Sequence, residues 1–490
     1  MPSTSIKERA CHRVPEIKHQ RIWRSASRRR TAGPPADATG PPSCALRSGA
    51  MATHAKQGLN PDYERRSLWG ATMPALPDRA GRPLPDTADV VVIGGGYAGI
   101  NAARELARRG VGVTLLEAET LGFGASTRNG GIVHAGYKWS PSQLIRRYGE
   151  ETGRALSAVT LDGYQTVKRL IAEEAIDCDF REVGHLELAY APSHVAGLEH
   201  EREGLAAVGV KATMVPRERI REEIGSDAYH GALVVPGSGL LHPGRYFAGL
   251  AAAAGRAGAD LHEGVRARTI RRQGDGRFVV ETERGAIMAR DVFVATNGYT
   301  DGVAPTLRRR VIPIGSYIIA SEPLPEDLAH ELSPKGRSFF DTKNFLYYWH
   351  ISADRRMVFG GRASFLPTSI DHTAEILHKG LLEVHPQMAG RRIEYAWGGN
   401  VGFTFDRMPH VGRTKDGVAY AMGCCGTGVA LMTHMGTAVG AWLAGGEAPA
   451  LAKLSFPLVP APYEGRPWFL PLVGEWYRYQ DCRAARSRSR

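Results

Sequence analysis

Three glycines and one carboxylate have the spacing of a dinucleotide-binding site. Gly94, Gly96 and Gly99 form the pattern Gly-x-Gly-x-x-Gly, and Glu117 follows 23 residues after Gly94. Gly94 permits a tight turn, Gly96 lets the backbone approach a pyrophosphate, and Gly99 lets a helix pack closely on a strand. The phosphate then meets free N–H groups and the positive end of a helix dipole. We expect Glu117 to accept hydrogen bonds from both ribose hydroxyls.

The elements that must position these residues arrive in the required order. A β-branched run at 89–93 predicts a strand before the glycines, and residues 100–109 predict a helix after them. Gly110 ends that helix, and residues 111–116 predict a second strand that leads to Glu117. This order separates a dinucleotide site from a chance glycine pattern. It fits NAD and FAD equally well.

A second glycine-rich loop, residues 121–131, favours FAD over NAD. Backbone donors and one arginine in such a loop can follow the pyrophosphate and ribityl chain of an extended cofactor. On composition alone, a plain surface loop is the alternative. The loop residues that we expect to contact the cofactor are Ala125, Ser126, Arg128, Asn129 and Gly130.

With these segments and several later motifs, the sequence resembles the D-amino-acid oxidase-like flavoproteins, a family that includes glycine oxidase, sarcosine oxidase and γ-glutamylputrescine oxidase. The resemblance covers roughly residues 65–450 and is closest to the γ-glutamylputrescine oxidase branch. Besides the two glycine-rich segments, the motifs that carry it are Val265 in a short strand, Ala295-Thr-Asn-Gly-Tyr-Thr300, Phe359-Gly-Gly-Arg362, Trp397-Gly-Gly399, Arg407-Met-Pro-His-Val-Gly-Arg413 and Gly423-Cys-Cys-Gly-Thr-Gly-Val-Ala430.

The resemblance implies an α/β fold of the glutathione-reductase type, with a Rossmann-like FAD-binding domain and a second, mainly antiparallel-sheet substrate domain. We expect non-covalent FAD, because the cysteine that sarcosine oxidases use for attachment is missing from residues 397–404. Together with the loop residues above, the expected cofactor contacts are Gly94, Gly96, Tyr97, Ala98, Gly99, Glu117, Val265, Thr296, Gly426, Thr427, Gly428 and Val429.

The domains are expected to interleave along the chain, because the long gaps between the cofactor motifs contain alternating patterns typical of an antiparallel sheet. The predicted segments are a disordered arm at 1–65, an FAD-binding domain at 66–170, 238–305 and 395–450, a substrate domain at 171–237 and 306–394, and a C-terminal tail at 451–490.

The reaction that the resemblance implies is oxidation of a carbon–nitrogen bond. Hydride moves from the carbon that bears the amine to the flavin, water hydrolyses the imine, and molecular oxygen reoxidises the flavin and yields hydrogen peroxide. Amino-acid oxidases of the family place an arginine where this chain has Val401, so we expect an amine or an ω-amino compound as substrate.

Four side chains are candidates for substrate contacts, and each has a structural alternative. Tyr348 is expected to face the pocket or to be a core aromatic, with Tyr347 facing away. Trp397 forms an aromatic wall for an ammonium group or packs in the core. Arg362 holds a substrate carboxylate or a structural salt bridge. His134 is the titratable group nearest the flavin ring or an ordinary structural histidine.

The net charge of +12 is concentrated at the two ends of the chain, and the body is nearly neutral. We therefore expect no nucleic-acid substrate. Residues 1–50 are a transit peptide, translated sequence upstream of a start at Met51, or a natural arm. No apolar stretch is long enough for a membrane span. Six cysteines without metal-ligand spacing suit a reducing compartment, so we expect a cytoplasmic protein without a metal.

Three other functions remain open on the sequence. A dehydrogenase would pass electrons to a quinone or a protein instead of oxygen. A flavin-dependent step in RNA modification would use the basic ends of the chain. A flavin-binding sensor or scaffold would hold the cofactor without oxidising an amine. The identity of the amine and the oligomeric state do not follow from the sequence.

Overall fold

The computed structural model describes residues 59–79, 81–362, 365 and 368–486. Most of the predicted arm lies outside these residues, and so do residues 1–50, for which the sequence suggested three origins. The described part of the arm packs on the rest of the chain. Tyr63 is buried there, and the N–H of Glu64 donates to the carbonyl of Glu394 at 2.8 Å.

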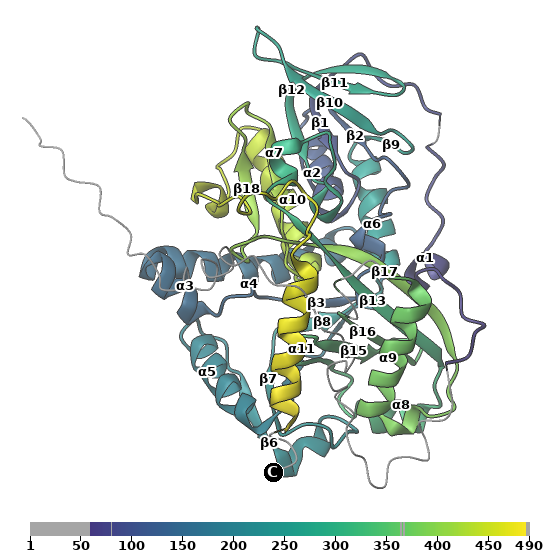
Figure 1. Ribbon diagram of the computed structural model, residues 1–490. Coiled ribbons are helices and arrows are strands. Elements are labelled where there is room, and N and C mark those ends of the chain that lie inside the picture. Colours follow the sequence, from purple (N-terminus) through teal and green to yellow (C-terminus); the bar gives the residue numbers. More distant parts are fainter. Residues whose placement is uncertain (1–58, 80, 363–364, 366–367, 487–490) are drawn as a thin grey trace, which may run out of the picture. The chain divides into compact units, whose positions relative to one another are not determined.

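The first sheet contains the predicted dinucleotide unit. Its central strand β1 pairs in parallel with β2 on one side and β12 on the other (Figure 1). Val90, Val91 and Val92 are fully buried, because one face of the strand packs on helices and the other on the antiparallel strands at 267–294. The strands of this sheet are β1 (Thr87–Ile93), β2 (Val113–Leu116), β9 (Asp260–His262), β10 (Ala267–Arg272), β11 (Phe278–Thr282), β12 (Gly285–Val294), β18 (His410–Arg413) and β19 (Ala419–Met422).

Two helices that cover this sheet cross at small residues. A Cβ atom on Gly436 of α10 would lie 2.2 Å from the carbonyl oxygen of Ala98 in α2, so only glycine permits this approach. A Cβ atom on Gly440 would lie 2.8 Å from the carbonyl oxygen of Ala102. The helices of the described chain are α1 (Leu68–Thr72), α2 (Tyr97–Arg108), α3 (Pro141–Tyr148), α4 (Glu150–Glu173), α5 (Val195–Ala206), α6 (Pro243–Arg256), α7 (Pro305–Arg308), α8 (Glu326–Leu332), α9 (Ile370–Val384), α10 (Gly428–Leu443) and α11 (Leu470–Arg486).

The second sheet is mainly antiparallel and is assembled from segments far apart in the sequence. Tyr348 of β15 lines a cavity, whereas Tyr347 packs against Phe359, as the alternation of a strand requires. In the order of the sheet, its strands are β17 (Ile393–Phe403), β13 (Ile312–Pro323), β16 (Arg356–Gly361), β15 (Tyr347–Ile351), β14 (Ser338–Asp341), β5 (His185–Leu188), β7 (Gly231–Val235) and β6 (Thr213–Pro216).

A small third sheet joins the loop after the dinucleotide unit to the rest of the chain. It consists of β3 (Ile132–His134), β8 (Ser238–Leu240) and β4 (Arg181–Glu182). The expected boundary before residue 395 falls inside β17, a strand of the second sheet. Part of the expected C-terminal tail is the helix α11.

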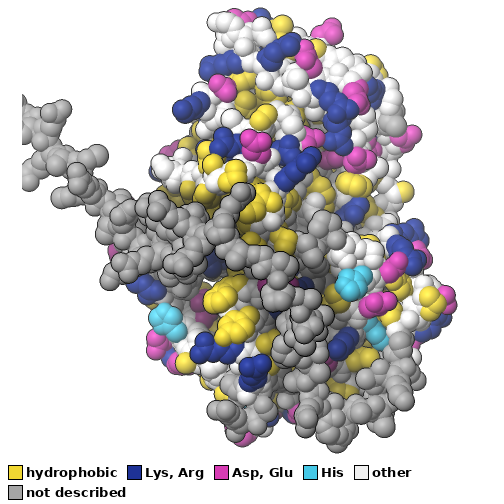
Figure 2. All heavy atoms as spheres, viewed as in Figure 1, with side chains coloured by type: hydrophobic (Ala, Val, Ile, Leu, Met, Phe, Trp, Pro, Cys, Tyr) yellow, Lys and Arg dark blue, Asp and Glu magenta, His cyan; other side chains and the backbone are white. Residues whose placement is uncertain are grey.

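The surface of the described residues mixes charges of both signs. On the face shown in Figure 2, basic and acidic side chains are interspersed around the region of β10, β11 and β12. None of the helices within the described ranges has the length and apolar character needed to cross a membrane.

Candidate active site

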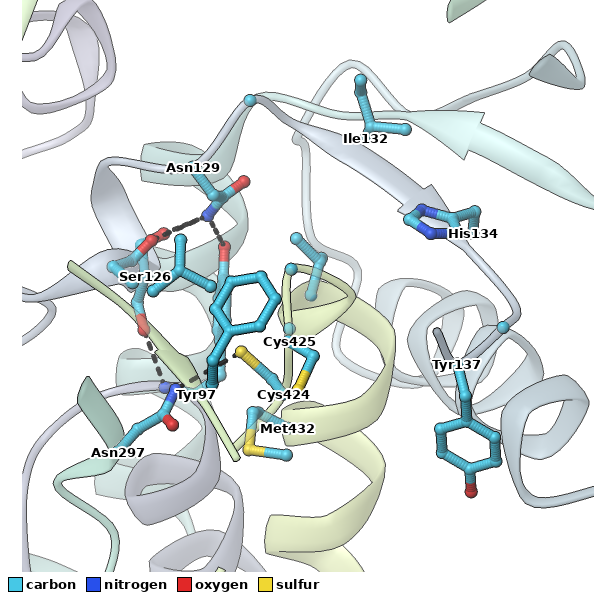
Figure 3. Close-up of a pocket in the computed structure, with 18 of the residues that line it drawn as sticks. Tyr97, Ser126, Asn129, Ile132, His134, Tyr137, Asn297, Cys424, Cys425 and Met432 are labelled. Carbon is cyan, nitrogen blue, oxygen red and sulfur yellow. Dashed lines mark hydrogen bonds between the residues drawn. The ribbon is translucent and has the colours of Figure 1, made fainter. Parts of the chain in front are cut away.

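A cavity of about 890 Å³ connects the dinucleotide unit with the second sheet. Its walls come from the glycine turn before α2, the loop before β3, the start of α10, and strands β5, β13, β15 and β17. Figure 3 shows Asn129 and Ser126 beside Tyr97, with Cys424, Cys425 and Met432 close by and His134 farther away. The cavity therefore joins the predicted cofactor site to the predicted substrate site.

The glycine turn at 94–99 is shaped by close backbone contacts. Gly94 has a φ of 107°, and a Cβ atom there would lie 3.0 Å from the backbone of Ala295. A Cβ atom on Gly99 would lie 1.9 Å from the carbonyl oxygen of Gly94. Gly96 precedes α2 and supplies no side-chain cap, and the first residue of that helix, Tyr97, donates its N–H to the Ser126 hydroxyl at 2.9 Å. The turn thus gives the close backbone approach to a pyrophosphate that its glycines predict.

Glu117 lies where β2 ends and lines the cavity. Its carboxylate accepts the N–H of Gly95 at 2.7 Å and the N–H of Glu119 at 3.0 Å. Burial raises its pKa, although backbone hydrogen bonds oppose that shift. The N–H of Val265 donates to the carbonyl of Glu117 at 2.8 Å. Val265 lines the cavity as expected, but it lies between β9 and β10, so its predicted place in a strand is wrong.

The loop at 121–131 is held in place by its own polar side chains. The Ser126 hydroxyl accepts the N–H of Tyr97 at 2.9 Å. Asn129 donates to the Ser126 carbonyl at 2.9 Å and to the Tyr97 hydroxyl at 3.3 Å (Figure 3). The Arg128 guanidinium, expected to face phosphate, donates to the carbonyls of Phe123 at 2.8 Å and Gly398 at 3.3 Å. Ala125, Ser126, Arg128, Asn129 and Gly130 all line the cavity.

The start of α10 forms another wall of the cavity. Gly426, Gly428 and Val429 line it, whereas the predicted contacts Thr427 and Gly99 do not. The Thr427 hydroxyl donates to the carbonyl of Cys424 at 2.9 Å and makes no cap bond to the helix. The N–H groups at the start of α10 are therefore not capped by the Thr427 side chain.

Two polar residues that the sequence did not single out support this wall. Asn297 follows the predicted contact Thr296, which also lines the cavity, and it accepts the N–H of Gly423 at 2.8 Å. A Cβ atom on Gly426 would lie 3.8 Å from Nζ of Lys138. The Lys138 side chain lines this cavity, and desolvation by the surrounding protein lowers its pKa. A cation and a helix start thus lie beside the same loop.

Three of the four predicted substrate contacts line the cavity. The Tyr348 hydroxyl lies 2.9 Å from Oγ of Ser316, and Arg362 donates to the carbonyl of Asn344 at 3.1 Å. His134 packs edge-on against the Phe340 ring at 5.3 Å. Burial lowers the pKa of His134 to about 3, so its imidazole is neutral at neutral pH.

Trp397 does not line the cavity, so the predicted aromatic wall is wrong. Its side chain is 3% exposed, and its Nε1 donates to the carbonyl of Arg128 at 3.0 Å. The ring packs against Trp69 with centroids 6.2 Å apart. Its cross-strand position opposite Ile318 turns it into the core, which is the structural alternative that the sequence had left open.

Three carboxylates that the sequence did not single out line the cavity near the second sheet, and one of them, Asp341 at the end of β14, lies 3.1 Å from Nζ of Lys343. Glu187 lies on β5 and Glu201 on α5. Burial, and then the negative charge of Glu187, raise the pKa of Glu201 to about 7. The alternation His185-Leu-Glu-Leu188 was a signal for Glu187, but nothing local pairs α5 with that strand.

A family model described as DAO, FAD dependent oxidoreductase, matches residues 89–442. The chain belongs to this DAO family. Its relatives include γ-glutamylputrescine oxidoreductase of Escherichia coli (strain K12), which is 35% identical over 81% of this chain and 93% of that protein. A probable oxidoreductase OrdL of Rhizobium meliloti is 33% identical over 86% of this chain and 98% of its own length.

Solved structures resemble about four-fifths of the chain in fold. Glycine oxidase from Geobacillus kaustophilus aligns with a TM-score of 0.64 and 22% identity, covering 77% of this chain and 98% of its own. L-proline dehydrogenase from P. horikoshii aligns with a TM-score of 0.62 and 20% identity, covering 81% and 99%. The predicted fold class and family are confirmed.

The cofactor of this DAO-family enzyme is FAD, as predicted. The residues present fit that group. The glycine turn brings the backbone before α2 to the cavity, Glu117 follows the second strand, and a glycine-rich loop precedes α10 on the far wall. FAD supplies two-electron redox chemistry when it is bound, and the start of α10 beside Lys138 stabilises negative charge.

Proposed function

We propose that the protein oxidises the C–N bond of an amine or an amino acid. When bound, FAD would supply the two-electron acceptor for the hydride that leaves the carbon bonded to nitrogen, and water would hydrolyse the imine product to a carbonyl compound and an amine or ammonia. Molecular oxygen takes the two electrons and forms hydrogen peroxide. The FAD is bound without a covalent link.

The observation that carries this proposal is the composition of the cavity wall beyond the cofactor residues. Glu187, and Glu201 in its ionised form, attract a cationic amine, and the aromatic rings of Tyr348 and Phe340 favour the same charge. The wall therefore supports an amine substrate.

The remaining cavity residues orient the substrate. The Tyr348 hydroxyl, 2.9 Å from Ser316, is available to hydrogen-bond the substrate nitrogen. Arg362 is positioned to bind an anionic group on the substrate, such as a carboxylate. The neutral His134 shapes the cavity and neither accepts nor donates a proton in the reaction. The reacting amine loses its own proton to water before hydride transfer.

The position of Val401 supports an amine over a simple α-amino acid. Val401 lines the cavity from β17, and its aliphatic side chain binds no carboxylate. The similarity to γ-glutamylputrescine oxidoreductase, an enzyme named for an amine conjugate, points the same way. We therefore propose an ω-amino compound that carries an anionic group away from the reacting nitrogen.

The proposal is tested by reduction of the bound flavin under anaerobic conditions. Polyamines, γ-glutamyl amines, N-methyl amino acids and D-amino acids are each mixed with the protein while absorbance near about 450 nm is recorded. We expect a γ-glutamyl amine or diamine to bleach the flavin and air to restore it with release of peroxide. Reoxidation by a quinone but not by air would show a dehydrogenase. No bleaching by any amine would contradict the proposal.

A further inference from the structure

The C-terminal helix α11 contacts the turn that precedes the pocket strand β15. This helix, Leu470–Arg486, lies beyond the residues 89–442 that match the family model. In Figure 1 it runs in front of the second sheet, and its Asp481 accepts the N–H of Asn344 at 2.9 Å. The turn, residues 342–346, joins β14 to β15, and both Thr342 and Leu346 line the cavity.

Asp481 of α11 fastens this turn through three hydrogen bonds. One carboxylate oxygen accepts the backbone N–H of Asn344 at 2.9 Å and its side-chain amide at 2.9 Å. The other oxygen accepts the backbone N–H of Phe345 at 3.0 Å. A carboxylate that holds two successive backbone N–H groups fixes the orientation of the peptide between them, because charge-assisted hydrogen bonds are short and strong.

The same turn holds the guanidinium of Arg362. The carbonyl of Asn344 accepts Nη1 of Arg362 at 3.1 Å, and the carbonyl of Leu346 accepts the backbone N–H of Arg362 at 3.4 Å. Among the described residues, no carboxylate lies within salt-bridge distance of Arg362. Burial lowers the pKa of Arg362, while the charge of Asp481 opposes that shift. Asp481 is thus connected to Arg362 by geometry and by charge.

Aromatic side chains also pack between α11 and the 342–346 turn. Phe345 packs against Phe365 at 5.3 Å, and Phe365 packs against Tyr477 of α11 at 6.0 Å. Gly474 permits the approach, because a Cβ atom there would lie 3.0 Å from the Phe365 ring. The Arg362 guanidinium lies 5.3 Å from the centre of that ring. The helix therefore contacts Arg362 through the turn and through the aromatic cluster.

We infer that Asp481 is a positioning residue for substrate recognition: through the 342–346 turn it holds Arg362 in the orientation that binds an anionic group on the substrate. The inference rests on the proposed function of the cavity. It assigns α11 to the substrate site and selects substrates that carry a carboxylate. Neither the helix nor the turn contributes an atom to the hydride transfer.

The test compares Asp481→Asn with Glu475→Gln in the FAD-loaded full-length protein. Glu475 lies on the same helix and pairs only with the exposed Arg478 among the described residues, so Glu475→Gln is a matched loss of charge. Butanoate and butylamine serve as probes, and perturbation of the flavin spectrum reports binding. We expect Asp481→Asn to weaken butanoate binding about tenfold or more, leave butylamine unchanged, and leave Glu475→Gln like wild type.

A second substitution separates positioning from folding. In an Arg362→Gln background, Asp481→Asn should have no further effect on butanoate binding, because both changes remove the same contact. If Asp481→Asn yields no folded protein, Asn344→Ala removes only the side-chain bond and should weaken butanoate binding selectively. Equal weakening of both probes, additive effects in the double variant, or wild-type binding by the variant would overturn the inference. A wild-type protein whose flavin responds to neither probe and to no amine would instead count against the proposed function.

Discussion

The carboxylate of Glu117 accepts the N–H of Gly95 at 2.7 Å and so joins the end of β2 to the glycine turn. This contact links the two parts of the cofactor site that the sequence places 22 residues apart. It also leaves Glu117 on the cavity wall, where a ribose would lie.

Replacing Glu117 should therefore weaken FAD binding. Glu117→Gln turns one acceptor into a donor facing the Gly95 N–H and removes the charge that attracts hydroxyl donors. We expect a loss of about 1.5–3 kcal/mol in FAD binding, measured by equilibrium dialysis. Asp89→Asn is the control, because Asp89 accepts the N–H of Gly112 at 2.8 Å without lining the cavity. Equal FAD retention in both variants would refute the role of Glu117.

Trp397 should matter for stability and not for substrate binding. Trp397→Phe loses the bond to the Arg128 carbonyl and leaves space beside Trp69. We expect the free energy of unfolding in urea to fall by about 1–3 kcal/mol while the KM for the amine stays unchanged. Trp476→Phe is the control, since Trp476 is 57% exposed on α11. A rise in KM without loss of stability would instead show that Trp397 contacts the substrate.

His134 should not appear in the pH profile of the reaction. Burial lowers its pKa to about 3, so it remains neutral throughout the range in which amines are oxidised. His134→Gln should change the rate through packing against Phe340 but leave the apparent pKa values of kcat/KM where they are in wild type. Steady-state kinetics across pH checks this. Loss of a limb near about 6.5, the usual histidine value, would show that His134 exchanges a proton.

Glu201 should make the stability of the protein depend on pH. Its pKa is raised from 4.5 to about 7, first by burial and then by Glu187, so its carboxyl group binds a proton more tightly in the folded state. The contribution of Glu201 to the free energy of unfolding is therefore fully present at pH values below the pKa that this group has in the unfolded chain. It is lost as the pH rises through about 7. Unfolding in urea at several pH values should show this decline in wild type and a smaller one in Glu201→Gln.

The control for this prediction lies on the same helix. Glu203 is two residues away, its side chain is 62% exposed, and it does not line the cavity. Glu203→Gln should reproduce the wild-type dependence on pH. Identical curves for all three proteins would mean that Glu201 is no harder to ionise in the folded protein than in the unfolded chain.

The sequence predicted the glycine turn because that turn depends on local sterics. A Cβ atom on Gly99 would clash with Gly94 at 1.9 Å, and such a requirement is visible in the residue types themselves. The alternation at 345–351 likewise predicted that Tyr348 and Tyr347 face opposite ways. Both inferences needed only neighbours in the sequence.

The substrate side was harder to predict because distant segments build it. Trp397 turns into the core because β17 pairs with β13. No pattern in the neighbouring residues predicts that pairing. Glu201 meets Glu187 only after α5 and β5 pack beside the same cavity. Asp481 reaches Asn344 from 137 residues away. Composition indicated a tail at that position, whereas the structure has a helix.

The most direct test of the central claim is the stoichiometry of one anaerobic turnover. FAD-loaded protein is mixed with excess of the amine that reduces it, and the carbonyl product is measured as a hydrazone by mass spectrometry. We expect one carbonyl molecule for each flavin reduced, with a matching amount of peroxide after air is admitted. Reduced flavin without a carbonyl product would contradict oxidation of a C–N bond.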